Sequence, residues 1–265
     1  MNDPGLQDQI AAAEAYEALH VPALFQEWTD PVLDAAGLTS GQHVLDVACG
    51  TGVLARAASE RVGPTGSTTG VDPNAGMLAV AAKLDSTVEW RPGVAEALPF
   101  PDASFDAVVS QFGMMFFADR LAALREMSRV LVPGGRLVVA VWDALENSPA
   151  YSLEVALLDR LAGRPAADAL RAPFALGDPQ ELTALCEAAG LSAPKVISRM
   201  GTARFPSIRM MVEADLRGWL PVMGVTVSEP QIERILAEAE RELAHLVEEG
   251  GDVVFDSPAH LVVVS

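Results

Sequence analysis

The sequence is poor in cysteine, in basic residues and in long apolar runs. Two cysteines among 265 residues, Cys49 and Cys186, cannot build a disulfide framework, and neither has metal-ligand spacing. Eighteen basic residues against 36 acidic ones give a net charge of −18, which argues against partners such as nucleic acid or an anionic membrane surface. No apolar run approaches about 18 residues, and the polar start MNDPGLQDQI is untypical of a signal peptide. We therefore expect a cytoplasmic protein without membrane insertion.

Half of the residues are hydrophobic and 20% are charged, so the chain can bury a sizeable core as a single domain over residues 1–265. Strand-like apolar runs alternate with helix-like segments through the first half. The expected strands are 43–48, 67–72, 87–93, 105–113 and 136–143, and the expected helices between them are 52–61, 73–83 and 118–131. This alternation predicts an α/β fold, with a mostly parallel sheet covered on both faces.

The alternation changes after Asp143. Helices are expected at 149–163 and 178–189, a sixth strand at 194–205, and a seventh at the closing AHLVVVS. Two more helices, near 207–219 and 229–248, interrupt the last two strands, so residues 206–250 are predicted to form a helical cap insert. The alternative is a stabilising addition without a role at the site.

A small glycine-rich turn follows the first strand in HVLDVACGTG, residues 43–52. Ligands in doubly wound sheets bind at the carboxyl ends of the strands, where strand order reverses. The turn has no lysine and is not a P-loop. Residues 50–55, GTGVLA, fit a dinucleotide pattern with Asp72 at the ribose position, which leaves an NAD-dependent oxidoreductase open. Asp46, however, would repel a pyrophosphate and favour an ammonium or sulfonium group.

Four blocks of sequence carry a family resemblance. DVACGTG resembles motif I of the class I S-adenosylmethionine-dependent methyltransferases, and VDPNAGML (71–78) resembles their next motif. GVAEALPFPDASFDAVVS (93–110) and LVPGGRLVVAVW (131–142) are similar to the ubiquinone/menaquinone-biosynthesis-like branch (methyltransferase type 11). The resemblance implies a Rossmann-like, doubly wound sheet of seven strands with the last strand antiparallel. It also implies S-adenosylmethionine as cofactor and S-adenosylhomocysteine as product.

The resemblance also implies a role for individual residues. Asp46 would contact the amino group of the cofactor, Asp72 both ribose hydroxyls, and Pro73 with Met77 the adenine. The remaining expected cofactor contacts are Tyr16, Ala48, Gly50, Thr51, Ala95, Glu96 and Gln111. Two positions depart from the family: Val94 stands where an aspartate often receives the adenine amino group, and Ala48 replaces the first motif glycine. Glu96, backbone near Ala95, or water would then receive the adenine.

The methyl acceptor is expected to be a small, hydrophobic or aromatic molecule, methylated by in-line displacement. QFGMMFF (111–117) follows the fourth strand, where Met115 and Phe116, with Trp28 and Trp219, are candidates for the acceptor pocket; core packing is the alternative. Residues 1–40 would form an N-terminal helical lid. There His20 shares a helix face with Tyr16 and is a candidate base, or else a structural histidine.

Three matters stay open at this level. No metal site is expected, because no histidine has a suggestive partner. The oligomeric state is open, a homodimer included. A member of the fold that binds the cofactor without transferring methyl is a further alternative, since fold does not fix function.

Overall fold

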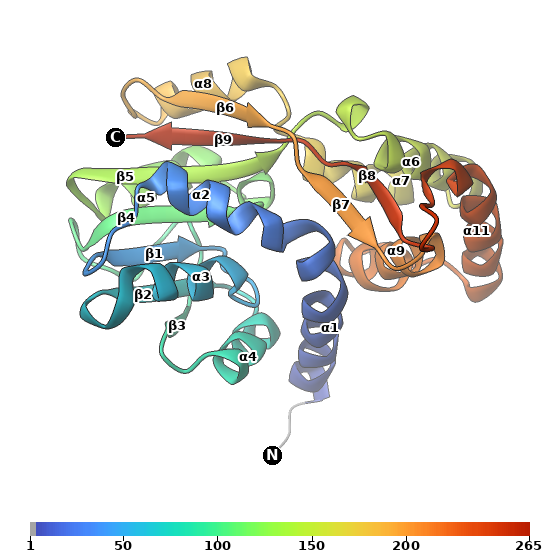
Figure 1. The fold of residues 1–265 in the computed structure, drawn as a ribbon, viewed down its shortest axis with the longest axis horizontal. Coiled ribbons are helices and arrows are strands. Elements are labelled where there is room, and N and C mark those ends of the chain that lie inside the picture. The colour runs from blue at the N-terminus through green and yellow to red at the C-terminus, as the bar shows by residue number, and fades with distance from the viewer. Residues whose placement is uncertain (1–3) are drawn as a thin grey trace.

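The computed structural model describes residues 4–265 and contains a seven-stranded sheet (Figure 1). Its order is β3-β2-β1-β4-β5-β9-β6, and only β9 runs antiparallel to its neighbours. The predicted doubly wound sheet with a reversed last strand is confirmed. The strands are β1 (His43–Val47), β2 (Ser67–Asp72), β3 (Glu89–Pro92), β4 (Phe105–Gln111), β5 (Leu131–Trp142), β6 (Lys195–Arg199) and β9 (Ala259–Val264).

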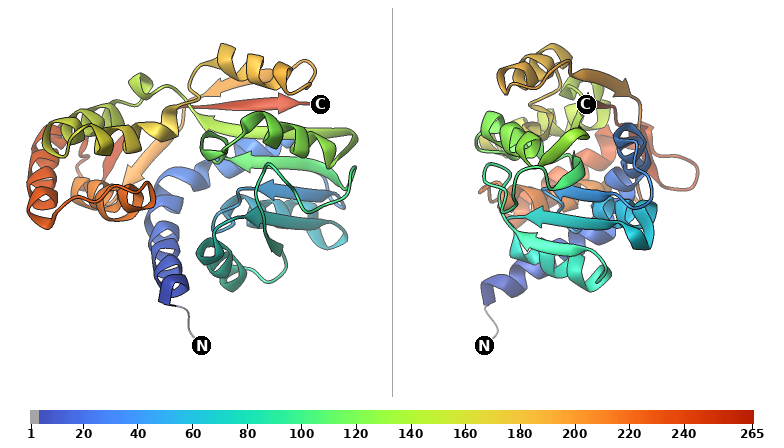
Figure 2. Two further views of the ribbon diagram at one scale, coloured as in Figure 1. Left: turned by 180° about the vertical axis from the view of Figure 1, so that it is seen from behind. Right: turned by 90° about the vertical axis from the view of Figure 1, so that its left-hand side faces the viewer.

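Helices cover both faces of this sheet (Figure 2). Side-chain caps start several of them: Asn74 accepts from the N–H groups of Gly76 and Met77, and Asp119 accepts from that of Ala122. Valines at the centres of β4 and β5 are fully buried, as expected for strands packed on two sides. The covering helices are α2 (Thr29–Ala36), α3 (Val53–Val62), α4 (Ala75–Leu84), α5 (Arg120–Arg129) and α8 (Pro179–Ala188).

Strand order reverses beside β1. From β1 the chain moves outward through β2 to β3, and then returns to place β4 on the other side of β1. The carboxyl ends of β1, β2 and β4 therefore meet at the switch point, which is where ligands bind in such sheets.

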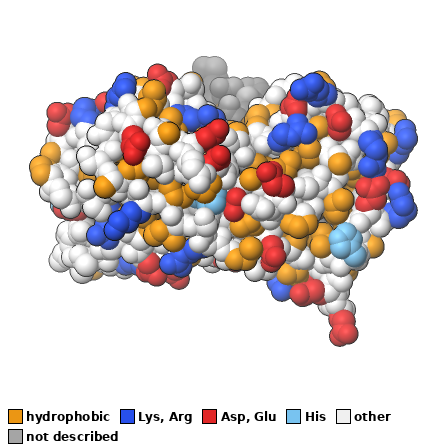
Figure 3. Space-filling model, turned by 90° about the horizontal axis from the view of Figure 1, so that it is seen from above, with side chains coloured by type: hydrophobic (Ala, Val, Ile, Leu, Met, Phe, Trp, Pro, Cys, Tyr) orange, Lys and Arg blue, Asp and Glu red, His pale blue; other side chains and the backbone are white. Residues whose placement is uncertain are grey.

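A second lobe lies beside the sheet, and Figure 3 shows acidic, basic and apolar side chains interspersed over the two lobes from above. It packs helices around a two-stranded antiparallel sheet of β7 (Thr202–Phe205) and β8 (Val253–Asp256). Sequence patterns predicted most of its helices, but not the short α7 or strand β8. The helices are α6 (Pro149–Leu161), α7 (Arg164–Arg171), α9 (Ile208–Ala214) and α11 (Glu229–Glu242).

One predicted strand was wrong. Residues 194–205 do not form a single sixth strand, because β6 stays in the main sheet and β7 joins the second lobe. The division falls at Gly201. A Cβ there would lie 2.4 Å from Glu27 Oε1 and 2.5 Å from the ring of Trp28, so the backbone passes closely against the N-terminal segment. The strand expected at 136–143 also starts earlier, at Leu131.

Helix α1 (Pro4–His20) runs between the two lobes and packs on α4 (Figure 1). Glu17 pairs with Arg56 of α3 at 2.7 Å, and Glu14 pairs with Lys83 of α4 at 2.8 Å. A π-helical turn, η1 (Val21–Phe25), then leads the chain back toward the sheet. In the part of the chain that the structure describes, no helix combines the length and apolar character needed to cross a membrane.

Candidate functional site

Asp46 lies at the carboxyl end of β1 and is 1% exposed. Neither carboxylate oxygen makes a hydrogen bond of normal geometry within residues 4–265, although the Ala55 N–H faces the group and partly offsets its charge. Burial, and next the charge of Asp72, hold the pKa of Asp46 well above its usual range. An ionised Asp46 therefore needs donors from outside the protein.

Asp72 ends β2 and is also buried, but its oxygens have partners. Oδ2 accepts from the Gly50 N–H at 2.9 Å, and Oδ1 accepts from the Asn74 N–H at 2.8 Å. Burial raises the pKa of Asp72, and these two backbone donors lower it in part. Asp72 thus ties the glycine turn after β1 to the start of α4. Each oxygen keeps a second lone pair for a ligand.

A cavity of about 70 Å³ lies between this turn and the N-terminal segment. Besides Asp46, its wall holds two buried oxygens without hydrogen-bond partners among the described residues, Thr51 Oγ1 and Gln111 Oε1. Gln111 is fixed by donation from Nε2 to the Phe25 carbonyl at 3.0 Å. Acceptor oxygens around one small space suit an ammonium group with its three N–H donors.

The same cavity is too small for a nucleoside, since about 30 Å³ is the share of one water molecule in liquid water. Tyr16 of α1 lines it, and burial together with the charges of Asp72, Glu17 and Asp46 raises the pKa of its phenol.

Two loops approach each other closely over the switch point. Ala48 after β1 has φ +60° and Phe112 after β4 has φ +56°, a region that side chains other than glycine rarely adopt. A Cβ at Gly113 would lie 2.6 Å from the Cβ of Ala48, so glycine is needed there for contact between the loops. Strain of this kind gathers at functional sites. The turn tolerates alanine at position 48, but in a strained conformation.

Cys49 lies in the same turn, and burial together with Asp46 and Asp72 raises the pKa of its thiol well above the usual value. It is therefore a poor nucleophile. Across residues 4–265 there is no group of three or more His, Cys, Asp or Glu side chains able to hold a metal ion.

His20 has an acidic partner that sequence reasoning missed. Its ring stacks on Tyr16 at 5.6 Å between centroids, and Nε2 lies 3.8 Å from Oδ1 of Asp215. Asp215 starts η7 (Asp215–Trp219), a π-helical turn in the second lobe. The pair joins α1 to that lobe, and no sequence spacing links residues so far apart.

The residues expected around adenine lie near one another but differ in role. Met77 and the exposed Pro73 stand at the start of α4, directly after Asp72. Ala95 is buried, and Val94 is 45% exposed. Glu96 accepts from the N–H groups of Ala118 and Asp119, which lead into α5, at 2.7 and 3.3 Å. That oxygen of Glu96 is used in the protein itself, and adenine recognition by it stays a prediction.

The expected acceptor residues divide into two sets. Phe116, in η4 (Met114–Phe116), is 45% exposed and meets Trp219 of the second lobe at 5.2 Å between rings; Met115 beside it is buried. Trp219 is fixed by donation from Nε1 to the Ala169 carbonyl at 2.9 Å. Trp28 is instead 1% exposed and packs edge-on against Phe112 and Trp142 in the core.

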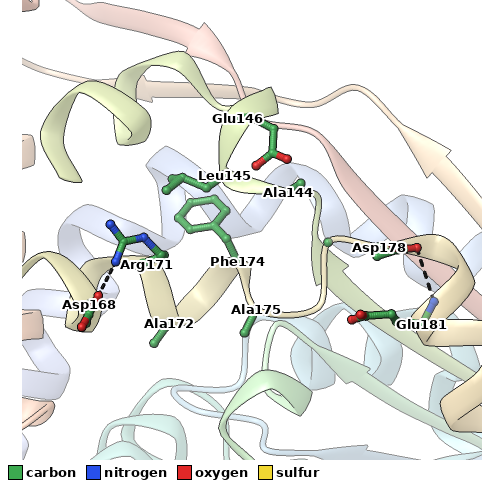
Figure 4. A pocket seen from close by; sticks show the side chains of 11 residues that line it. Ala144, Leu145, Glu146, Asp168, Arg171, Ala172, Phe174, Ala175, Asp178 and Glu181 are labelled. Carbon is green, nitrogen blue, oxygen red and sulfur yellow. Dashed lines mark hydrogen bonds and ion pairs between the residues drawn. The ribbon is translucent and has the colours of Figure 1, made fainter. Parts of the chain in front are cut away.

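A larger, open groove of about 490 Å³ lies elsewhere, between the loop after β5 and helices α7 and α8 (Figure 4). Glu146, Asp168, Asp178 and Glu181 line it with Arg171, which pairs with Asp168. Neither Asp46 nor Asp72 is among the residues that line it. Size alone therefore does not identify the site, and the buried oxygens without partners at the switch point are the stronger indication.

Comparison with known proteins agrees with this geometry. Residues 45–139 match the family described as "Methyltransferase domain". The chain is 44% identical over 135 residues to the ubiquinone/menaquinone biosynthesis C-methyltransferase UbiE of Hahella chejuensis, over 48% of this chain and 54% of that protein. It is 40% identical over 151 residues to a demethylmenaquinone methyltransferase of Staphylococcus aureus, over 55% of this chain and 62% of that protein.

The chain thus spans between half and two thirds of the length of these relatives. A crystal structure described as a putative methyltransferase from an antibiotic biosynthesis pathway of Anabaena variabilis superposes with a TM-score of 0.67 at 17% identity, over 90% of this chain and 96% of that one. This likeness concerns the fold alone.

Residues 45–139 thus match a methyltransferase domain, and the fold around them is similar to that of a solved methyltransferase-like structure. The relatives that match about half of the chain carry the names of quinone-biosynthesis methyltransferases, UbiE and demethylmenaquinone methyltransferase. The resemblance inferred from motifs at 43–143 is confirmed. The dinucleotide reading of GTGVLA is not favoured.

Proposed function

We propose that this protein transfers a methyl group from S-adenosylmethionine to a small, hydrophobic or aromatic acceptor. One observation carries the proposal: Asp46, a buried carboxylate without a hydrogen bond of normal geometry among the described residues, faces a small cavity at the switch point of the sheet. A pyrophosphate would be repelled there, whereas the ammonium and sulfonium of the methyl donor would be attracted.

The residues present fit this cofactor. Asp46, Thr51 and Gln111 would receive its ammonium, and the free lone pairs of Asp72 would receive both ribose hydroxyls. Tyr16, Ala48 and Gly50 would complete the methionine end, and Pro73, Met77, Ala95 and Glu96 the adenine end. When bound, the cofactor supplies a methyl group activated by the positive sulfur.

The contribution of the chain is then mainly orientation and exclusion of water. Holding donor and acceptor in line is worth roughly 7–11 kcal/mol in favourable systems. Met115, Phe116 and Trp219 would form the apolar wall for the acceptor, and α1 would act as a lid over the cofactor. His20, held by Asp215, would take a proton from an acceptor that must lose one.

The relatives named above support a quinone-like acceptor, and the high negative charge opposes nucleic acid as substrate. Together with the absence of a spanning helix among residues 4–265, this charge supports action in the cytoplasm. The helices at 206–250 would cap the acceptor pocket.

Isothermal titration with S-adenosylmethionine, S-adenosylhomocysteine and NAD, each alone, tests the proposal. We expect micromolar binding of the two sulfur ligands and none of NAD. Binding of NAD alone would refute the donor site and favour an oxidoreductase. Transfer is then measured as S-adenosylhomocysteine formed with demethylmenaquinone analogues and simple phenols. Tight cofactor binding without transfer to any of them would favour a non-methylating member of the fold.

A further inference from the structure

The glycine turn after β1 has one open side and one filled side. A Cβ on Gly50 would meet no atom within 4 Å, and Gly50 lines the cavity that Asp46 faces. Gly52, which caps the start of α3 with φ +87°, differs. A Cβ there would lie 2.8 Å from Cζ3 of Trp90 and closer still to Cη2. The turn is therefore open toward the cavity at Gly50 and in contact with an indole ring at Gly52.

The same ring covers the middle of β2. Trp90 belongs to β3, the edge strand of the sheet, and pairs in register with Gly70 of β2 (Figure 1). A Cβ on Gly70 would lie 2.5 Å from Cζ3 and 2.6 Å from Cε3 of Trp90. Two glycines, one in the strand and one at the end of the turn, thus leave room for one indole. In such close packing a change in volume is transmitted to the neighbouring residues.

A hydrogen bond fixes the orientation of the indole. Its Nε1 donates to the Asp85 carbonyl at 2.8 Å, and Asp85 directly follows the last residue of α4. Trp90 is half-buried and is not among the residues that line the cavity. Any effect of Trp90 on a ligand in the cavity must therefore pass through the residues that the ring contacts.

The turn is held from two directions. The Gly50 N–H donates to Oδ2 of Asp72 at 2.9 Å, and Gly52 contacts the ring of Trp90. Thr51, whose buried Oγ1 has no hydrogen-bond partner among residues 4–265, lies between these two contacts. Without the indole, Gly52 can move into the emptied space. The Gly50 N–H and Thr51 would then move with it, away from the cavity.

We propose that Trp90 is a positioning residue of the donor site. Its indole sets how far the glycine turn stands from β2 and thereby holds Gly50 and Thr51 where they bind the methionine end of the cofactor. The inference rests on the proposed function, because it assigns a supporting residue to the same site. It requires no contact between Trp90 and the cofactor.

Isothermal titration of the full chain with two ligands tests the role of Trp90. S-adenosylhomocysteine and methylthioadenosine share the nucleoside, but only the first has the amino-acid end. Trp90→Leu removes the ring atoms that contact Gly52, and it should weaken S-adenosylhomocysteine binding about tenfold, within the range of coupling between residues in contact. Methylthioadenosine should lose about threefold or less, because Asp72 keeps its bond from the Asn74 N–H. Trp90→Phe keeps a smaller ring and should fall between Trp90→Leu and the wild type.

Phe105→Leu is the matched control. Phe105 is buried at the start of β4, at the opposite end of the sheet from the site, and meets Phe100 edge-on at 5.0 Å. Its replacement should lower the free energy of unfolding in urea, because buried aromatic volume is lost, but should leave both affinities at the wild-type value. A loss of affinity in Phe105→Leu equal to that in Trp90→Leu would overturn the proposal, because any core substitution would then have the same effect.

A compensating substitution tests the contact itself. Gly70 does not have a positive φ, so alanine there meets a lack of space and not a strained backbone. Gly70→Ala alone should weaken S-adenosylhomocysteine binding, because its methyl group displaces the indole. In Trp90→Leu the methyl group enters space that the indole has left. The double variant should therefore bind more tightly than the product of the two single effects predicts.

Three further results would overturn the role of Trp90. They are wild-type affinity for S-adenosylhomocysteine in both Trp90 variants, an equal loss for the two ligands, and independent effects in the double variant. If Trp90→Leu does not fold, Trp90→Phe decides the comparison. Failure of the wild type to bind S-adenosylhomocysteine would refute the proposed function instead. Normal wild-type binding together with any of the three results would refute the role of Trp90 alone.

Discussion

Replacement of Asp72 by asparagine separates the two roles of this carboxylate. In the structure it organises the glycine turn by accepting from Gly50 and Asn74, and in our proposal it also binds both ribose hydroxyls of the cofactor. An amide has one oxygen and one NH₂ group, so Asp72→Asn keeps acceptors for only half of these donors. The NH₂ group also faces a backbone N–H without an acceptor.

The expected magnitude follows from these bonds. Hydrogen bonds to a charged acceptor contribute about 1.5–3 kcal/mol each. Loss or weakening of both ribose bonds amounts to about 3 kcal/mol, or roughly 100-fold in the dissociation constant of S-adenosylhomocysteine. One lost backbone partner should lower the free energy of unfolding by about 1–3 kcal/mol.

Titration calorimetry measures the affinity, and urea denaturation measures the stability. Asp106→Asn is the control, because Asp106 Oδ2 accepts from the His43 N–H at 2.7 Å at the opposite end of β1. It should lose stability but keep wild-type affinity. If Asp72→Asn loses stability and yet binds S-adenosylhomocysteine within about threefold of the wild type, the ribose assignment is refuted.

Three further predictions concern the same region. Burial, and next the charge of Asp72, raise the pKa of Asp46 above its ordinary value of 3.8. Protonated Asp46 therefore contributes its full share of folding stability below pH 3.8, and this share is lost as the pH rises through the pKa of the folded state. The free energy of unfolding of Asp46→Asn, measured by urea denaturation, should therefore rise relative to that of the wild type from pH 4 to pH 8. The same difference between variant and wild type at the two pH values would contradict this. Gly113→Ala should destabilise by about 1–3 kcal/mol through contact with the Cβ of Ala48, and Ala48→Gly should recover most of the loss in the double variant. Glu96→Gln should weaken S-adenosylhomocysteine binding much less than Asp72→Asn and lower the unfolding temperature slightly, because its oxygen accepts from two backbone N–H groups just before α5. A large loss of affinity would show that Glu96 reads the adenine directly.

The sequence predicted those parts of the fold that depend on local patterns. Apolar runs of strand length alternate with helix-period segments up to Asp143, and the sheet follows because such strands must be covered on both faces. The glycine turn and the two aspartates at the ends of β1 and β2 were also visible, since each residue is defined by its place relative to one strand.

Local patterns failed where distant contacts decide the outcome. Residues 194–205 have strand character throughout, yet they divide between two sheets at Gly201, where the backbone passes close to Glu27 and Trp28. Trp28, expected in the acceptor pocket, is held in the core by Phe112 and Trp142. An aromatic residue fits either place, and the choice depends on neighbours from other elements.

The sequence by itself determined the fold class and the place of the glycine turn with its two aspartates, because both arise from residues within a single strand–turn–helix unit and its neighbour. Tertiary structure alone decided that His20 meets Asp215 and that Glu154 is fully buried. His20, Glu154 and Asp215 come from three segments that lie far apart in the sequence. Tertiary packing removes Glu154 and Asp215 from water, and removal from water is what makes their charges matter.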